Sequence, residues 1–232
     1  MKSLIGAVLA VMVIVSAASA GQFGPPEPMA DTGKFSLGLG YWFDQSEMKL
    51  DSSHLLGTMT DKSSQYYLQG NYTFLKDWEV YGRFGAADMK VDSGVGNFSD
   101  SGEPYGTLGF KGVLYRYNNF AVGPFIQGSW YGDHTGVAKN QWDTNVGISA
   151  QYKIPVGSCD FTVYGGPFAY WHQADSLLAF RPVVAQDDMK QKNNVGGFLG
   201  VKVPIVKQKV FFTAEGQLTN KVGAGASIGY AF

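Results

Sequence analysis

Residues 35–44 read Phe-Ser-Leu-Gly-Leu-Gly-Tyr-Trp-Phe-Asp, with a large apolar side chain at every odd position from Phe35 to Phe43. Ser36, Gly38, Gly40 and Asp44 fall on the opposite face of an extended chain. A period of two is typical of a β-strand with one apolar and one polar face. This stretch therefore predicts a strand that begins next to residue 34.

The same alternation recurs along the rest of the chain. Ten runs begin near residues 35, 65, 78, 107, 120, 142, 161, 195, 210 and 222. The composition agrees with an all-β protein, since 31 of 232 residues are glycine and 15% are aromatic. A net charge of −1 gives no bulk attraction for nucleic acid, and the single cysteine cannot form an internal disulfide. We expect an antiparallel sheet of about ten strands.

The chain begins with an export signal. Lys2 precedes an apolar run from Leu4 to Val15, and small residues follow it up to Ala20. This order is typical of a secretory signal peptide, and the run is shorter than the roughly 20 residues that a spanning helix needs. The predicted division is a signal peptide at residues 1–20 with cleavage between Ala20 and Gly21, a short N-terminal tail at 21–33, and the sheet at 34–232.

The charged residues within the strands decide between a soluble sandwich and a membrane barrel. Seven of them lie well inside the runs, and all seven fall on the polar face: Glu79, Arg83, Lys111, Asp143, Lys153, Lys202 and Glu215. A basic side chain facing lipid near the bilayer midplane costs roughly 2–4 kcal/mol. The apolar face is thus predicted to contact lipid, and the charges to line the lumen of a closed barrel.

Aromatic residues on the apolar face gather at the strand ends. One predicted girdle holds Phe74, Trp78, Phe120, Tyr152, Phe161 and Phe232, and the other holds Tyr41, Phe43, Tyr66, Trp130, Trp142 and Trp171. Two such girdles are typical of the two interfaces of a membrane barrel.

Connection lengths alternate as well. Short turns are predicted near residues 75–77, 115–119, 155–160 and 204–208, and long loops at 45–63, 88–104, 133–140 and 173–193. Short periplasmic turns and long outer loops are the asymmetry expected of an outer-membrane barrel. The fifth outer connection, at Asn220-Lys221, is short and departs from it.

The C-terminus, Ser-Ile-Gly-Tyr-Ala-Phe, ends in Phe232 with Tyr230 two places before it. This resembles the assembly signal of bacterial outer-membrane barrels, and strand phrases such as Val80–Gly85 are similar to the small porin-like, OmpA-type barrel family. The resemblance covers residues 34–232. It implies an antiparallel up-and-down barrel in the outer membrane of a Gram-negative cell envelope, in contact with lipid and lipopolysaccharide and inserted by the barrel-assembly machinery.

The chain departs from that family in three respects. The OmpA-type barrel has eight strands whereas ten are counted here, although eight strands remain open if one hairpin has been divided wrongly. The family's peptidoglycan-binding domain is absent. Pro124 and Pro167 interrupt two predicted strands, each within a Gly-Pro-Phe sequence, and suggest bulges or bends.

The predicted lumen carries four basic and three acidic residues. Near-balance in a narrow barrel favours a charge network that largely plugs the lumen, and so a non-enzymatic envelope or surface-presentation role for a monomer. The alternative is a narrow porin-like channel for small polar solutes, for which lumen glycines leave room.

A third hypothesis is an enzyme acting on lipid or peptide at the outer rim. His54, His134 and His172 each lie near aspartates and serines, yet their spacing matches no rim enzyme family. We expect no catalytic residue, no metal site and no cofactor. The predicted loop at 173–193 is unusually apolar between Leu177 and Val184, which suggests that it covers the barrel mouth or touches lipid.

Overall fold

A computed structural model describes residues 21–50, 59–93, 96–134, 138–156, 159–176, 188–191, 194–206, 209–219 and 221–232. Twelve strands account for most of these residues. They are β1 (Phe35–Leu50), β2 (Met59–Leu75), β3 (Trp78–Ser93), β4 (Gly96–Gly112), β5 (Tyr115–Tyr117), β6 (Phe120–Tyr131), β7 (Ala138–Val156), β8 (Cys159–Ser176), β9 (Asp188–Gln191), β10 (Val195–Val206), β11 (Val210–Leu218) and β12 (Lys221–Ala231).

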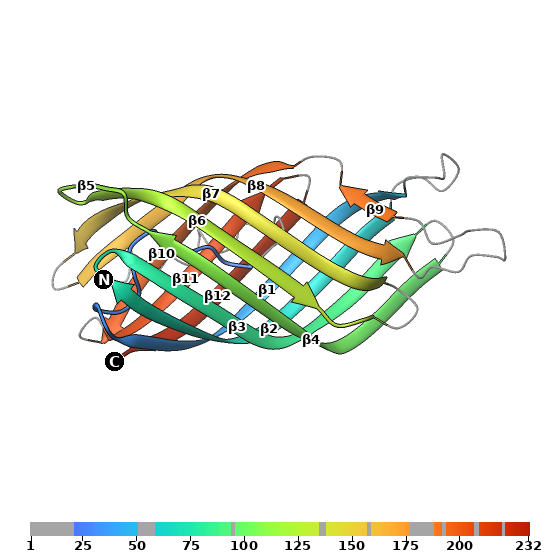
Figure 1. Ribbon diagram of the computed structural model, residues 1–232, viewed down its shortest axis with the longest axis horizontal. Helices are drawn as coiled ribbons and strands as arrows, with labels where there is room; N and C mark the ends of the chain where they lie inside the picture. Colours follow the sequence, from blue (N-terminus) through green and yellow to red (C-terminus); the bar gives the residue numbers. More distant parts are fainter. Residues whose placement is uncertain are drawn as a thin grey trace.

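Ten of these strands close into an antiparallel barrel (Figure 1). Each strand pairs with the next along the chain, β8 pairs with β10, and β12 returns to β1 from Ser36↔Ala231 to Ser46↔Lys221. The two remaining strands, β5 and β9, are short additions to this ring. The predicted ten-stranded up-and-down barrel is confirmed.

The two faces of the wall divide as the alternation predicts. On β3, Val80 and Phe84 are exposed, whereas Glu79, Tyr81 and Arg83 are buried. Thirty-two large hydrophobic side chains are exposed among the described residues, which leaves the outer surface as a belt that only lipid can cover. A closed barrel with an apolar exterior and a polar interior is a membrane-spanning structure of the bacterial outer membrane, and the protein is located there.

The end that carries the short turns and the C-terminus is the periplasmic end, following the usual asymmetry of such barrels. At the opposite, outer end the structure corrects the predicted loops. β3 and β4 pair out to Ser93↔Gly96, so most of the predicted 88–104 loop is a strand hairpin. A spanning strand needs only about 9–11 residues, and the wall therefore continues beyond the membrane.

The strand β9 changes the barrel at its outer end. β1 pairs with β12 up to Ser46 and then with β9 from Met48 to Leu50. We followed the pairing from Leu39 of β1, moving each time to the residue paired with it on the next strand. This row passes through β2, β3, β4, β6, β7, β8 and β9 and returns to β1 at Lys49. This row crosses eight strands, because β10, β11 and β12 all end below the point where it passes from β8 through β9 to β1.

Both Gly-Pro-Phe sequences coincide with gaps in the hydrogen-bond ladder. β6 pairs with β4 up to Lys111↔Phe125 and with β5 from Tyr115↔Val122, so three residues oppose two around Pro124. The extra residue lies opposite Pro124, between Lys111 and Tyr115, and forms a bulge there rather than in β6 itself. Around Pro167 the β7–β8 pairing skips from Gly147↔Phe168 to Ala150↔Gly165 with its register unchanged.

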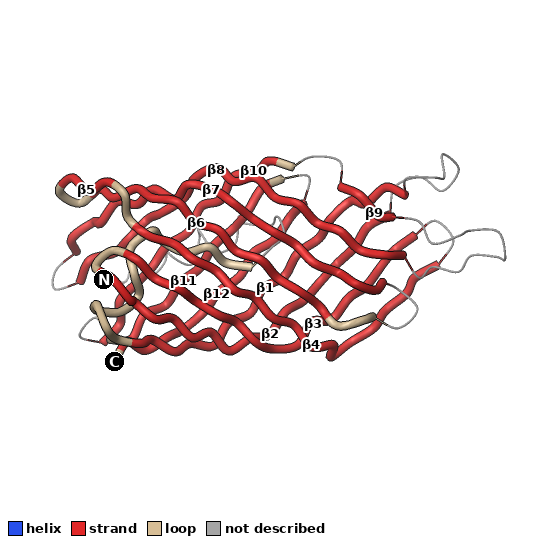
Figure 2. Tube along the Cα trace, in the orientation of Figure 1, coloured by secondary structure: helices blue, strands red, loops and turns tan. Residues whose placement is uncertain are grey.

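The first part of the N-terminal segment, residues 21–30, lies inside the barrel. In Figure 2 it is the tan chain that runs among the strands near the periplasmic end. Residues 21–26 and Met29 are buried, and residues 31–33 are exposed. The Gly33 N–H donates to the Thr73 carbonyl (2.7 Å). The sequence predicted only a short tail here.

Candidate functional site

The occupied lumen is the candidate functional site, and Glu215 of β11 holds the inner end of the N-terminal segment. The Phe23 N–H donates to Glu215 Oε1 (2.9 Å), and the Gly24 N–H donates to Oε2 (2.9 Å). Gln217 Nε2 donates both to Oε1 of Glu215 (2.9 Å) and to the Gly21 carbonyl (2.7 Å). One buried carboxylate thus binds two consecutive backbone N–H groups, which are charge-assisted hydrogen bonds.

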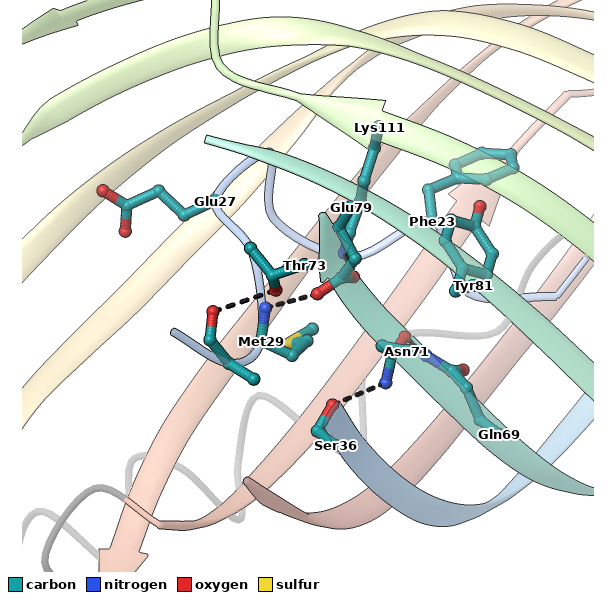
Figure 3. Close-up of polar contacts among 12 residues, drawn as sticks. Phe23, Glu27, Met29, Ser36, Gln69, Asn71, Thr73, Glu79, Tyr81 and Lys111 are labelled. Carbon is teal, nitrogen blue, oxygen red and sulfur yellow. Dashed lines mark hydrogen bonds and ion pairs between the residues drawn. The ribbon is translucent and has the colours of Figure 1, made fainter. Parts of the chain in front are cut away.

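A second carboxylate holds the segment six residues further on. The Met29 N–H donates to Glu79 Oε2 (2.6 Å), and the Thr73 hydroxyl donates to the Ala30 carbonyl (2.9 Å) (Figure 3). Lys111 Nζ lies 3.5 Å from Glu79 Oε1, and both side chains are buried. The ion pair therefore neutralises the carboxylate that binds the segment.

Arg83 binds the segment through a carbonyl. Its guanidinium donates from Nη2 to the Gln22 carbonyl and from Nε to Gln69 Oε1 (2.8 Å). It also lies 5.2 Å from the ring centres of both Tyr67 and Tyr81. These contacts hold the guanidinium across the middle of the lumen by hydrogen bonds and cation–π attraction.

At the periplasmic rim the segment is fixed by ion pairs. Glu27 pairs with Arg116 of β5 and, through Oε2, with Lys153 Nζ of β7 (2.6 Å). Arg116 also pairs with Asp77 in the β2–β3 turn. Arg116 and Lys153 are partly exposed, so this rim latch lies where water reaches it.

An apolar group of rings surrounds Phe23. The aromatic box comprises Phe125 of β6, Tyr164, Phe168 and Tyr170 of β8, and Phe198 of β10. The Phe23 ring lies 4.3 Å from that of Phe125 in a stacked arrangement, and 4.8 and 5.1 Å from Phe168 and Phe198 edge to face. Both Gly-Pro-Phe phenylalanines belong to this box.

A second aromatic cluster occupies the lumen nearer the outer end. Trp42, Tyr67, Tyr105 and Ala87 pack together with Tyr131 beside them. The Tyr131 hydroxyl donates to Asp143 Oδ2 (2.8 Å).

The structure changes the predicted charge balance of the lumen. Among the described residues, the buried Asp, Glu, Lys and Arg side chains are four carboxylates and two cations: Asp44, Glu79, Asp143, Glu215, Arg83 and Lys111. Lys153 sits instead at the rim with Glu27, and half-buried Lys202 lies 5.3 Å from the Phe211 ring. The near-balance inferred from sequence omitted Asp44 and counted two lysines that are not fully buried.

The residues predicted for the girdles lie on the outside of the wall. Tyr41 and Tyr66 face each other across β1 and β2 with ring centres 5.0 Å apart, and Trp130 is opposite Trp142. Phe74, Phe120, Tyr152 and Trp171 are also exposed, whereas Trp78 and Phe161 are half-buried. Tyr230 and Phe232 make an edge-to-face contact at 5.0 Å, and the Phe232 N–H donates to the Phe35 carbonyl.

Two of the three histidines are described. His134 is buried, with Nδ1 3.9 Å from Asp100 Oδ2, and within the described ranges no hydroxyl hydrogen-bonds to it. His172 is half-buried on β8, where it is paired with Asp143 in the β7–β8 ladder. His54 and the apolar stretch 177–184 lie outside the described residues, and so does the Ala20 side of the predicted cleavage site.

Sequence reasoning missed the lumen aromatics and the residues of the segment that bind the wall. Trp42, Phe125, Phe168 and Phe198 occupy inward positions in runs whose other inward residues are small, polar or tyrosine. Their parity along each strand is the signal that could have identified them. Phe23 and Met29 are isolated apolar residues in a proline-rich stretch without period, and nothing local marks them as buried.

Among the described residues, no helix is long and apolar enough to cross a membrane. The same residues contain no group of three or more His, Cys, Asp or Glu side chains placed to hold a metal ion.

The sequence matches no protein-family model, and no curated protein matches it significantly. Several solved structures are similar in shape. The translocator domain of the autotransporter NalP from Neisseria meningitidis aligns with a TM-score of 0.48 at 11% identity, over 87% of this chain and 90% of that one. An outer membrane channel from Pseudomonas putida F1 gives 0.43 at 11% identity, over 92% and 100%.

The outer membrane protease OmpT from Escherichia coli gives a TM-score of 0.43 at 10% identity, over 86% of this chain and 95% of that one. These similarities are too distant to say what the chain does, and the barrel rests on the strand pairing described above.

Proposed function

We propose that the protein is a non-enzymatic outer-membrane barrel whose lumen is closed by its own N-terminal segment. Its role is to contribute to the structure of the cell envelope and to hold the outer ends of its strands at the cell surface. The observation that carries this proposal is the seating of residues 21–30 in the lumen. Side chains of β2, β3, β7 and β11 hydrogen-bond to the backbone of that segment. A barrel of eight to ten strands has little spare interior, so one buried chain is enough to obstruct it.

The proposal includes cleavage between Ala20 and Gly21. The Gly21 carbonyl is bound by Gln217, and the residue lies beside Arg83 inside the lumen. Cleavage there would place the new amino terminus inside the lumen, beside Arg83 and Gln217. Mass spectrometry of the protein from outer membranes should give a chain that begins at Gly21.

The test of closure is single-channel conductance of the mature chain, refolded and inserted in a planar bilayer in molar KCl. The wild-type protein should give no steps. Deletion of residues 22–30 should give reproducible steps, because it removes the segment and leaves polar wall residues such as Gln127, Ser149 and Thr107 facing water. Steps in the wild-type protein would contradict a closed lumen.

A matched pair of variants separates the latch from general loss of charge. Glu27→Gln removes the two ion pairs that Glu27 makes at the rim and should produce brief openings. Lys34→Gln removes the exposed pair with Asp31, which lies outside the lumen, and should leave the barrel closed. Equal behaviour of the two variants would show that the rim latch does not hold the segment.

The second candidate function is a narrow channel for small polar solutes. The rim latch favours it, since partly exposed ion pairs contribute little to stability and can exchange with water. Such a channel would open when the segment leaves the lumen. The conductance of the variant that lacks residues 22–30 therefore measures the size of its open pore.

The proposed partners follow from the surface. Lipid and lipopolysaccharide would cover the exposed belt of the monomer, and the assembly machinery would bind the last strand through Tyr230 and Phe232. Truncation of Phe232 should lower the amount of barrel recovered from outer membranes.

A further inference from the structure

We propose that the aromatic box is a binding site for a small arylalkylamine, a molecule with one aromatic ring and a protonated amine two carbons away, which competes with Phe23 for the box and for Glu215. The inference rests on the proposed closure of the lumen by the N-terminal segment, and it assigns a ligand class to the site that the segment occupies.

The box belongs to the wall, and Phe23 does not. Its five rings come from β6, β8 and β10. β8 pairs directly with β10, and β6 is connected to β8 through β7, whose ladder with β8 has a gap next to Phe168. Phe23 is the one ring of the cluster that the segment contributes. The proposal requires the five wall rings, which their own strands hold, to leave a ring-sized space when Phe23 withdraws. Apolar cavities lined by such side chains bind small aromatic molecules.

The position of Glu215 fixes the chemistry of the ligand beyond a simple ring. The Phe23 N–H donates to Oε1 at 2.9 Å and approaches Oε2 at 3.2 Å, while the Phe23 ring lies in the box. The nitrogen, Cα, Cβ and ring of a phenylalanine form the skeleton of phenethylamine. A phenethylamine placed on that fragment would put its ammonium on Glu215 and its ring against Phe125.

The charge of the lumen selects an amine over an acid. The carboxylate of Glu215 is the charged group that the ligand's nitrogen would meet at the place of the Phe23 N–H. When the segment withdraws, Glu215 loses the N–H groups of Phe23 and Gly24 and keeps Gln217 as a donor. A buried carboxylate that has lost donors favours a cation that restores them, whereas an aromatic carboxylate would place a second negative charge beside Glu215.

The ligand competes with the segment, so its apparent affinity depends on how often the box is free. The apparent dissociation constant is the intrinsic one divided by the fraction of molecules with the box empty. Any change that frees the box should therefore tighten binding without altering the box itself.

The experiment measures phenethylamine binding to the refolded mature protein by isothermal titration, with protein-free micelles as the blank. Phe23→Ala should lower the apparent dissociation constant by about tenfold or more, and deletion of residues 22–30 should do the same. Phe211→Ala removes a lumen phenylalanine outside the box and should leave the wild-type value unchanged. Each variant is first checked for the circular dichroism and heat-shifted gel mobility of a folded barrel.

Two further comparisons test the role of the amine. Phenylacetate has the same ring and the opposite charge, and it should bind Phe23→Ala at least about tenfold more weakly than phenethylamine, as expected for loss of a charge-assisted bond. Glu215→Gln in the Phe23→Ala background should remove that preference. In bilayers, phenethylamine should raise the open probability of the wild-type protein.

Equal phenethylamine affinity in the wild-type protein, Phe23→Ala and the deletion would overturn the proposal, because competition with the segment would be absent. Equal affinity for phenylacetate would overturn the assignment of an amine. A wild-type barrel that conducts without ligand would contradict closure, a different failure that the conductance records identify independently.

Discussion

At the scale of single residues, we expect the buried Lys111–Glu79 ion pair to be important for the free energy of unfolding. Both side chains are buried, and Glu79 also accepts the Met29 N–H. Lys111→Met leaves a buried carboxylate without its cation and should cost about 3–5 kcal/mol. Urea unfolding in phospholipid vesicles measures the loss. Adding Glu79→Gln should recover most of it, and a double variant no more stable than Lys111→Met would refute this account of the pair.

His134 provides a pH-dependent contact beyond the outer girdle. Burial lowers the pKa of this imidazole, and the carboxylates of Asp100, Glu103, Asp88 and Asp133 oppose the shift only in part. An unfolded histidine takes up its proton near pH 6.5, about its ordinary value, whereas the folded one does so at lower pH. Between those two values the open form binds more protons, so stability is present above pH 6.5 and is lost as the pH falls.

Amide exchange checks this directly. The N–H groups of His134 and Ala138 donate to each other's carbonyls at 2.9 and 3.1 Å. After correction for intrinsic rates, their protection should fall between pH 7 and pH 5, while that of Trp130 in β6 stays constant. His134→Gln should abolish the pH dependence, and a pH profile unchanged by this substitution would assign the effect to another group.

The residue scale also shows the limits of the alternation signal. Val80, Phe84, Glu79 and Arg83 take the sides of the wall that their parity predicts. The parity of Phe125 predicts an inward position, and its side chain does face inward although it is apolar. Alternation identifies the two sides of a strand, but only the partner across the lumen decides whether an inward position is wet or apolar.

At the scale of elements, β9 determines how many strands surround the outer end. Lys49 of β1 is paired with Lys190 of β9. Cysteines at these two positions, in a Cys159→Ser background, should form a disulfide on oxidation, because paired Cα atoms lie within the range that a disulfide spans. Faster migration on a non-reducing gel reports it. The control pair Lys49→Cys with Gln191→Cys is one position out of register and should not cross-link.

Element lengths were the less predictable part of the fold. The ten runs located the membrane-spanning strands, because lipid enforces apolar residues at every second position there. Above the membrane both faces meet water, the constraint disappears, and polar strands such as the paired ends of β3 and β4 resemble loops in sequence. For the same reason β9, which reads Asp-Met-Lys-Gln, fell within a predicted loop.

At the scale of the whole molecule, the barrel wall can be predicted from the sequence, whereas the segment inside it cannot. The wall repeats one rule ten times, so its architecture and membrane location follow from sequence. The segment at residues 21–33 obeys no repeat, and its place in the lumen depends on Glu79, Arg83 and Glu215, which come from strands far apart in the chain. Such a convergence becomes visible only when the sheet is closed.

The position of the barrel in the bilayer yields the last prediction. Phe120 and Trp130 are exposed at the two ends of β6, and ten residues along a strand tilted by about 40° span roughly 25 Å across the membrane. Ile126 is exposed between them. Ile126→Arg should therefore cost about 2–4 kcal/mol in vesicles, and Phe120→Arg at the interface about 0–1 kcal/mol from its charge. Unfolding titrations of both variants compare the two depths on one strand. Equal losses would mean that the belt is not centred on Ile126, and a larger loss at Phe120 would shift the membrane toward the periplasmic turns.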